Sequence, residues 1–264
     1  MGTAASIVAW RRDLAPGVRT VITGRHGGVS QPPYDPLNLA ISIGDDPAAV
    51  LRNREIVASA CGMAPGQMVW MRQVHGTRVC YGQPGVPREA REAREAGLPG
   101  EAGRAMEADA VFTDLPGVML GVLAADCAPV LLADPTAGIV GAAHSGRAGT
   151  EAGVVVALVK AMTGSGAEPG RMHALIGPTI CGGCYCVPEE LAARVVAAQP
   201  QTRCVTRSGA PGLDIRAGIA AQLAKLGVGK IAHDRRCTAE TADLCSHRRD
   251  GPVGRFGALI WREP

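Results

Sequence analysis

The 264-residue sequence predicts an α+β fold in which mixed β-sheets carry helices on their outer faces. Two observations lead to this prediction. Short apolar segments, rich in Val, Ile, Leu and Ala and bounded by Gly, Pro or Asp, indicate many buried strands. Longer segments with helix-capping residues lie between them, but several strands also follow one another directly. The order therefore lacks the regular strand–helix alternation of a doubly wound parallel sheet.

Eight segments have the length and composition of strands. Each is apolar or β-branched and ends at a residue that favours a turn. Aromatic residues make up only 3% of the chain, so the core must consist mainly of aliphatic side chains. In chain order the predicted strands are residues 18–23, 68–71, 108–113, 118–125, 129–134, 138–144, 173–177 and 256–261.

The first predicted helix is the best defined. Asp46 is placed to cap its first turn, Pro47 suits the first helical position, and Gly62 follows its end, so that these signals enclose residues 48–61. Three further segments carry similar signals, at residues 150–164, 188–200 and 214–227.

A low-complexity segment interrupts this pattern. Residues 88–97 read REAREAREAG and lie in a stretch rich in Pro and Gly. A charged recognition helix is one interpretation, but a repeated polar tract with little apolar surface to bury is typical of a solvated segment. We therefore expect a single domain over residues 1–264, with a surface insertion at residues 88–104.

Composition excludes several classes of protein. The formal net charge is only +3 and the arginines are scattered, so the sequence shows no basic patch for nucleic acid. It has neither a secretory signal nor an apolar run of about 18 residues, so we expect no export and no membrane span. Nine cysteines, an odd number, favour free thiols in the reducing cytoplasm over a disulfide framework. The oligomeric state stays open.

Three residues of metal-ligating type stand at the ends of predicted strands. His75 and Cys127 each follow such a strand, and His144 ends another. Two imidazoles and one thiolate match a catalytic zinc site, in which three protein ligands leave a fourth position open. Their separations form no compact ligand motif, however, and a single buried cysteine is often only a small core residue. The residues alone leave both interpretations open.

Eight motifs along the chain carry a resemblance to a known family. In order they are RHGGVS (25–30), NLAISIGDDPAAVLRNR (38–54), QVHGTRV (73–79), ADAVFT (108–113), ADCAPVLL (125–132), GAAHSG (141–146), IGPTICGGCYCV (176–187) and CSHRRDGPVGR (245–255). They resemble the YfiH-type family, whose members have been called polyphenol oxidase or laccase-domain proteins and zinc-dependent purine nucleoside phosphorylases with adenosine deaminase activity. The resemblance implies an α/β/β/α sandwich of mixed sheets in a single domain.

The resemblance also implies the chemistry. It identifies His75, Cys127 and His144 as the ligands of a catalytic Zn²⁺ ion. The expected substrates are a purine nucleoside, of the adenosine, inosine, guanosine or methylthioadenosine type, and inorganic phosphate. A zinc-bound water of lowered pKa would account for the deamination of adenosine. Asp126, next to Cys127, has two interpretations: it orients a ligand histidine, or it caps backbone amides of its loop.

Phosphorolysis requires in addition a site for the phosphate anion. Arg25 and Arg248 are the candidates, because a guanidinium offers phosphate a bidentate fork; each has an alternative as an ordinary ion-pair arginine. Asn38 and His26, in turn-rich motifs, are candidates for a contact with the ribose.

Two departures from the family pattern concern this site. The family continues AGWRG after the last histidine, whereas this chain has SGRAG, so that Arg147 takes the Trp position and Ala148 the Arg position. In the YEV motif, Cys186 replaces the glutamate. Cys181 and Cys184 form a CxxC pair, but one such pair is a weak indication of a metal or redox site.

Two other functions stay open and a third is excluded. A cysteine hydrolase would use Cys127 as its nucleophile and His144 or His75 as its base. A non-enzymatic metal-binding or cell-wall accessory protein would need the metal ligands but no substrate site. A multicopper oxidase is excluded, because six histidines without a His-X-His pair are too few for a multicopper cluster, and copper is therefore not expected.

Overall fold

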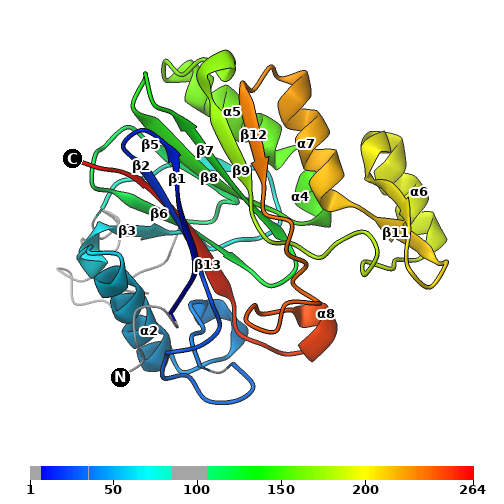
Figure 1. The fold of residues 1–264 in the computed structure, drawn as a ribbon, viewed down its shortest axis with the longest axis horizontal. Helices are drawn as coiled ribbons and strands as arrows, with labels where there is room; N and C mark the ends of the chain where they lie inside the picture. Colours follow the sequence, from blue (N-terminus) through cyan, green and yellow to red (C-terminus); the bar gives the residue numbers. More distant parts are fainter. Residues whose placement is uncertain (1–6, 35, 85–105) are drawn as a thin grey trace, which may run out of the picture.

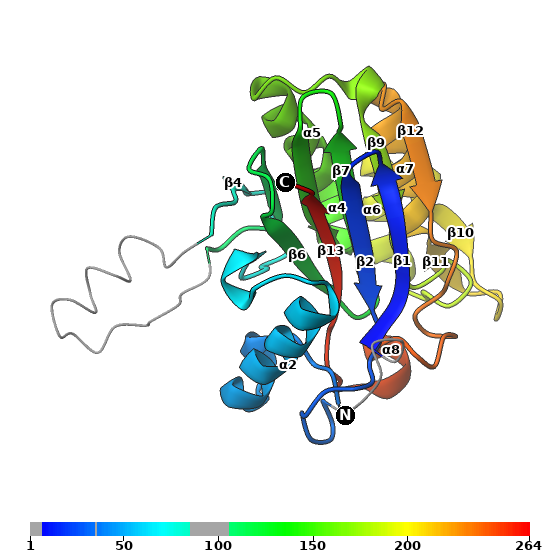
Figure 2. The same ribbon diagram turned by 60° about the vertical axis from the view of Figure 1, so that its left-hand side comes forward.

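The computed structural model describes residues 7–34, 36–84 and 106–264. Two β-sheets stacked face to face form its centre, and helices cover their outer faces, as Figure 1 and Figure 2 show. The expected α+β sandwich, with its layers in the order α/β/β/α, is thereby confirmed. The insertion predicted at residues 88–104 lies outside the described residues.

The first sheet has five strands in the order β1-β2-β13-β6-β3. Neighbouring strands are antiparallel, except that β3 runs parallel to β6. Because β3 and β6 are parallel, with Trp70 beside Gly121, both strands point toward the same end of the sandwich. The strands are β1 (Val8–Ala15), β2 (Val18–Thr23), β3 (Met68–Trp70), β6 (Met119–Ala124) and β13 (Phe256–Arg262).

The second sheet has six strands in the order β12-β9-β7-β8-β5-β4. The two outer pairs, β12 with β9 and β5 with β4, are parallel, and the other neighbours are antiparallel, so this sheet is mixed as well. Its strands are β4 (Val79–Tyr81), β5 (Ala110–Thr113), β7 (Ala128–Asp134), β8 (Ile139–Ser145), β9 (His173–Ile176) and β12 (Lys230–His233). A separate ribbon pairs β10 (Arg203–Val205) with β11 (Pro211–Leu213).

The helices divide between the two outer faces. α2 (Pro47–Ala60) packs on the first sheet, and α5 (Val154–Gly164) and α7 (Ile215–Lys225) pack on the second. None of the described helices combines the length and the apolar composition that crossing a membrane requires. The other helices and turns are η1 (Ile41–Ile43), η2 (Pro65–Gln67), α4 (Arg147–Ala152), η3 (Pro169–Arg171), α6 (Glu189–Ala198), η4 (Pro200–Thr202) and α8 (His247–Asp250).

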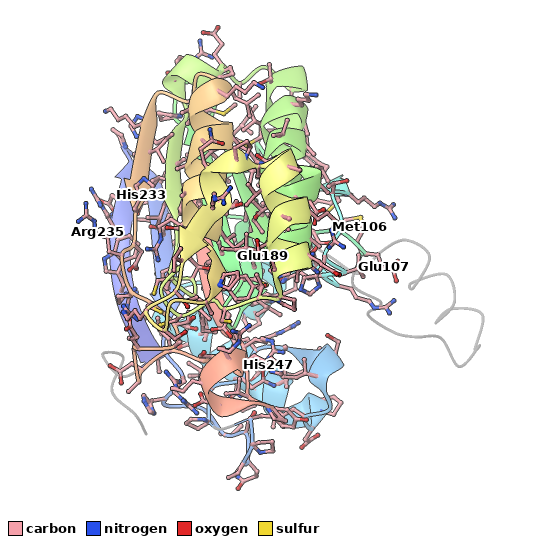
Figure 3. The ribbon with its side chains drawn as sticks, turned by 90° about the vertical axis from the view of Figure 1, so that its right-hand side faces the viewer. Met106, Glu107, Glu189, His233, Arg235 and His247 are labelled. Carbon is pink, nitrogen blue, oxygen red and sulfur yellow. The ribbon has the colours of Figure 1, made fainter. Side chains whose placement is uncertain are left out.

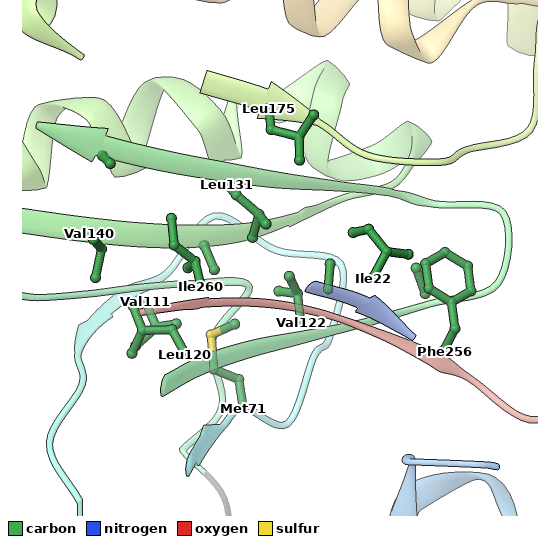
Figure 4. Packing of buried hydrophobic residues seen from close by; sticks show 14 of the residues in the cluster. Ile22, Met71, Val111, Leu120, Val122, Leu131, Val140, Leu175, Phe256 and Ile260 are labelled. Atoms are coloured by element: carbon green, nitrogen blue, oxygen red, sulfur yellow. The ribbon is translucent and has the colours of Figure 1, made fainter. Parts of the chain in front are cut away.

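The strands at the centre of the sandwich are buried on both faces. In β7, Leu131 belongs to the cluster between the sheets, whereas Val130 and Leu132 belong to the cluster under the helices. Figure 4 shows Leu131 and Ile22 among the apolar side chains that fill the space between the sheets. A sheet covered twice needs apolar residues at successive positions, which explains the continuous apolar runs in the sequence.

All eight predicted strands are present, with ends that differ by at most two residues from the prediction. The cap of α2 is also confirmed, because the Asp46 carboxylate accepts the backbone N–H of Ala48 at 3.0 Å. The strands that were not predicted include β1, β4 and β12, each at the edge of a sheet. Edge strands are often short or carry charged side chains, so they lack the continuous apolar run by which the eight strands were predicted.

One predicted helix needs correction. The segment expected as a single helix at residues 150–164 forms two helices, α4 from Arg147 and α5 from Val154. Gly153 separates them with φ of 84°, a left-handed conformation that ends a right-handed helix. The first of the two helices, α4, is separated by a single residue from the end of β8, the strand that carries His144.

Candidate active site

The fold brings the three predicted metal ligands together at one end of the sandwich. Cys127 ends the three-residue link that carries the chain from β6 in the first sheet to β7 in the second. His144 lies on β8, opposite Pro129 of β7. His75 lies in the loop that follows β3, which runs parallel to β6. Strands from both sheets therefore deliver one ligand each to the same place.

The three side chains form a compact donor set. Their ligand atoms all lie within 4.8 Å of one another, and Cys127 Sγ is 3.8 Å from His75 Nε2. The rings of His75 and His144 meet edge to face, with centroids 4.7 Å apart. His75 is exposed and His144 is buried, so the group is reached from the His75 side. Two imidazoles and a thiol in this arrangement fit a zinc ion with one open position.

Asp109 orients both histidines. This residue is fully buried and directly precedes β5. Its Oδ1 lies 2.9 Å from His144 Nδ1, and its carboxylate accepts the backbone N–H groups of Val74, His75 and Gly76 at 3.1, 2.9 and 2.7 Å. A hydrogen bond to the carboxylate requires a proton on Nδ1 of His144, so Nε2 is the nitrogen that can bind a metal ion once its own proton has been displaced.

Asp109 was missed in the sequence, and the partners of Asp126 differ from both expectations, because its carboxylate binds neither a ligand histidine nor the amides of its own loop. The signal for Asp109 was its place in the ADAVFT motif, a carboxylate just before a strand. The Asp126 carboxylate accepts the hydroxyls of Thr238 and Ser246 and the backbone N–H of Arg248, at 2.6, 2.7 and 2.7 Å. It therefore holds the start of α8, while Asp109 orients the ligand histidines.

The backbone at the site has two unusual residues. His75 has φ of 62° and Asp126 has φ of 97°, both in the left-handed region that residues other than glycine rarely occupy. Such a conformation costs on the order of 1–3 kcal/mol and persists where the surroundings impose it. For His75 the three hydrogen bonds to Asp109 supply that constraint, and for Asp126 the bonds to the start of α8 do.

Close packing also positions the ligands. A Cβ atom on Gly146 would lie 2.6 Å from Cys127 Sγ and 3.2 Å from a ring carbon of His75, so only glycine fits there. On the other side, Gln73 fastens the His75 loop to β6, because its side-chain amide both donates to and accepts from the backbone of Leu123 at 2.8 Å.

The pKa values of Cys127, His144 and Asp109 depend on one another. Burial opposes ionisation of Cys127, but the charge of His144 and hydrogen bonds from both histidines outweigh it and lower the thiol pKa to about 6. Burial likewise opposes a charged His144, but Cys127 and Asp109 outweigh it and raise the imidazole pKa to about 9. Burial also acts to raise the pKa of Asp109, yet bonds from His144 and the Gly76 amide bring it below its usual value. A thiolate and an imidazolium therefore stand side by side at neutral pH.

A cavity of about 450 Å³ opens over these ligands. That volume lies within the range of sites for small molecules. Figure 3 shows His247, one of the lining residues, on α8. The cavity is lined by Ala40, Ser42, Ile43, Met71, Gln73, His75, Leu123, Ala124, Ala125, Asp126, Cys127, His144, Ile180, Tyr185, His247, Arg248 and Arg255.

Arg248 is the predicted anion-binding residue that the structure places at the cavity. Its guanidinium lies over the ring of Tyr185, 5.1 Å from the centroid, and its Nη1 donates to the carbonyl of Cys186 at 3.0 Å. Tyr185, His247 and Arg255 also line the cavity and were not singled out in the sequence, although each stands in one of the quoted motifs.

Arg25, Asn38 and His26 are not among the cavity-lining residues. Arg25 Nη1 pairs with the Asp250 carboxylate at 3.1 Å. Asn38 is fully buried, and its side chain bonds to the backbone of Ala40 and, at 3.0 Å, to the N–H of Arg255. Its hydrogen-bonding groups are thus directed into the protein.

His26 lies at the surface, and Arg147 is partly exposed. His26 Nε2 lies 3.4 Å from Asp243, with more than half of each side chain exposed. Arg147 begins α4 and pairs with Glu151 one turn later, at 3.3 Å. Arg147 is likewise not among the cavity-lining residues, although its side chain lies close to Tyr185, which is one of them.

Known proteins resemble the chain over almost its whole length. The family model described as multi-copper polyphenol oxidoreductase laccase matches residues 19–263. A purine nucleoside phosphorylase of Streptomyces coelicolor is 45% identical over 95% of this chain and 98% of its own, and one of Deinococcus radiodurans is 41% identical over 90% and 87%.

Solved structures of similar proteins have the same fold as this chain. YlmD from Geobacillus stearothermophilus is 31% identical, with a TM-score of 0.83 over 96% of this chain and 94% of its own. The YfiH protein of Bacillus licheniformis is 28% identical, with a TM-score of 0.81 over 93% of each chain. The motifs, the sandwich and these relatives agree, and the chain belongs to the YfiH-type family, whose model carries the polyphenol oxidoreductase laccase description.

Proposed function

We propose that this protein is a zinc-dependent purine nucleoside phosphorylase, which transfers the ribosyl group of a purine nucleoside to inorganic phosphate. One observation carries the proposal: the three ligands His75, Cys127 and His144 share a cavity of about 450 Å³ with Arg248. The names of the Streptomyces and Deinococcus relatives support the same reaction. The proposed substrates are adenosine, inosine, guanosine and methylthioadenosine.

We propose zinc as the metal, although the family description names copper. Only His75, His144 and His247 of the six histidines line the cavity, which is too few imidazoles for several copper ions. Two histidines and one thiolate match the ligand number of a catalytic zinc ion. When bound, zinc supplies a Lewis acid and a water of lowered pKa, the kind of nucleophile that the proposed adenosine deaminase activity requires.

The residues around the ligands have separate tasks in this proposal. Asp109 holds His144 in one tautomer, and the histidines keep Cys127 in the thiolate form at neutral pH. Arg248 binds the phosphate, because its stacking on Tyr185 and its bond to a main-chain carbonyl fix the direction of the guanidinium fork. Phosphate held there attacks C1′ of the ribose while the purine leaves.

Two of the predicted substrate residues are proposed to act indirectly. Asn38 positions Arg255, whose backbone N–H it accepts, and Arg25 positions α8 through Asp250. We also propose a cytoplasmic location, which the free thiol state of all nine cysteines supports.

Adenosine incubated with the purified protein, with and without phosphate, tests the proposed function. Adenine and ribose 1-phosphate should form only when phosphate is present, whereas inosine should form in either buffer. Chromatography of the products separates the two reactions. Adenine release at an equal rate in phosphate-free buffer would mean hydrolysis and would contradict the phosphorylase assignment.

A cysteine hydrolase is the second candidate, favoured by the thiol pKa of about 6 at Cys127 beside His144. A cysteine–histidine dyad needs one imidazole, however, and the convergence of His75 on the same sulfur has no task in such an enzyme. Metal dependence distinguishes the two. A hydrolase would keep its activity in chelator and lose it to iodoacetamide, whereas the phosphorylase should lose activity in chelator and regain it with zinc. Protein without turnover on any nucleoside would favour a metal-binding accessory role.

A further inference from the structure

A second cluster of metal-ligating side chains lies outside the cavity. Cys181 and Cys184 follow β9, and Cys237 and Glu240 follow β12. One ligand atom from each residue lies within 4.8 Å of all the others. The strands β9 and β12 are parallel neighbours, side by side in Figure 1. The segments that follow them therefore leave the sheet at the same end of the strands. There, Thr179 forms a β-bridge with Cys237.

We propose that Cys181, Cys184, Cys237 and Glu240 bind a second zinc ion with a structural role. Three thiolates and one carboxylate supply the four ligands of a closed structural site. A tetrahedral ion with bonds of about 2.3 Å requires ligand atoms about 3.8 Å apart. For a sulfur and a carboxylate oxygen, whose bond to zinc is about 2.1 Å, the required separation is about 3.6 Å. Cys181 Sγ lies 4.0 Å from Glu240 Oε2, so a small side-chain movement would bring the pair to that distance. Each thiol releases its proton on binding, and no redox change is involved.

Arg207 supports this cluster from outside. Its Nη1 donates to Cys184 Sγ at 2.9 Å and to Glu240 Oε1 at 2.6 Å. The pairing anchors one oxygen of the carboxylate and leaves the other, Oε2, facing Cys181. Four anionic ligands around a doubly charged cation leave an excess of negative charge, which the guanidinium partly neutralises. The backbone N–H of Cys181 also donates to Cys237 Sγ, at 3.3 Å. Hydrogen bonds of this kind orient metal ligands.

The CxxC segment is folded so that both of its sulfurs face the cluster. The backbone N–H groups of Cys184 and Tyr185 both donate to the carbonyl of Cys181, at 2.9 and 3.0 Å, which closes a tight turn. Cys186, the third cysteine of this segment, is exposed and stands outside the cluster. The cluster therefore includes the cysteines that the turn directs to it and not every nearby thiol.

A metal ion at this place would fix one wall of the active-site cavity. Thr179 and Thr238, each within two residues of a proposed ligand, both donate to Asp126 at 2.6 Å, one to its carbonyl and one to its carboxylate. Tyr185, next to another proposed ligand, lines the cavity. Binding energy at the cluster would thus contribute to the stability of the segments that carry these contacts.

Elemental analysis of the purified full-length protein tests this site separately from the active site. The native protein should contain two zinc ions per chain. Cys127→Ala and Cys181→Ser should each contain one, and the double variant none. Cys186→Ser, a matched control from the same segment, should retain two.

A second measurement applies if Cys181→Ser does not fold. Cys127→Ala protein reconstituted with Co²⁺ should show thiolate-to-cobalt charge-transfer absorption in the near ultraviolet, because three thiolates would bind the ion. Cys127→Ala protein without zinc and without this absorption would overturn the second site. A disulfide between Cys181 and Cys184 in the purified protein would overturn it as well. A single zinc ion in native protein, lost in Cys127→Ala, would overturn the second site while leaving the first intact.

Discussion

The carboxylate of Asp109 accepts the Nδ1–H of His144 at 2.9 Å, and the backbone N–H of His144 donates to the Asp109 carbonyl at 2.8 Å. The two residues meet because β5 pairs with β8, which sets Ala110 beside Ala143. One residue thus fixes the tautomer of a ligand and, through three further amides, the conformation of the loop that carries His75.

Asp109→Asn should lower zinc affinity at the active site about tenfold to hundredfold, because the amide cannot accept all the hydrogen bonds that the carboxylate accepts. Competition with a chelator of known affinity measures the change. Asp126→Asn is the matched control, since it also removes a multiply bonded carboxylate but has no contact with His144. Equal losses in both variants would contradict the role of Asp109.

Replacing any active-site ligand should remove one zinc ion per chain. His75→Ala, Cys127→Ala and His144→Ala each leave two of the three donors, which is too few for tight binding of a catalytic zinc ion. Elemental analysis of each purified variant checks this result. Zinc contents equal to that of the native protein in all three variants would refute the site.

Zinc binding at this site should become weaker as the pH falls. The raised pKa of His144, about 9, means that a metal ion must displace a proton below that pH. The lowered pKa of Cys127, about 6, means that the thiol adds a second proton only below pH 6. The logarithm of the affinity should therefore rise by about one unit per pH unit between these values and more steeply below them. Titrations in Cys181→Ser protein isolate the active site, and a pH-independent affinity would contradict the ion pair.

Arg248→Ala should reduce phosphate-dependent adenine formation about tenfold to hundredfold, the cost of one charge-assisted contact of about 1.5–3 kcal/mol. Inosine formation should change less, because deamination uses no phosphate. Arg25→Ala is the comparison, and its effect should be smaller because Arg25 pairs with Asp250 and does not line the cavity. A larger loss in Arg25→Ala than in Arg248→Ala would reverse the assignment of the anion site.

Arg147→Ala should retain its zinc and most of its activity. The side chain pairs with Glu151 one helical turn away, and such partly exposed pairs contribute only a few tenths of a kcal/mol. Steady-state kinetics and zinc content check this expectation together. Zinc-loaded Arg147→Ala without activity would identify Arg147 as a site residue.

Local features of the molecule were legible in the sequence. The strands at the centre of both sheets follow from continuous apolar runs, and α2 follows from Asp46 and Pro47. These signals depend on neighbouring residues, which determine backbone conformation and capping directly. The ligand types at the ends of strands were visible for the same reason, but their convergence was inferred from the family motifs and not from their spacing.

The tertiary structure decided which residues far apart in the sequence contact one another. Asp109 meets His144 because two strands pair, and Cys237 meets the CxxC turn because β9 and β12 lie side by side. Asn38 is buried and Arg25 forms an ion pair with Asp250, although both stand in motifs that suggested substrate contacts. Contacts between residues far apart in sequence depend on strand order and register, which arise only when all the apolar faces are buried together.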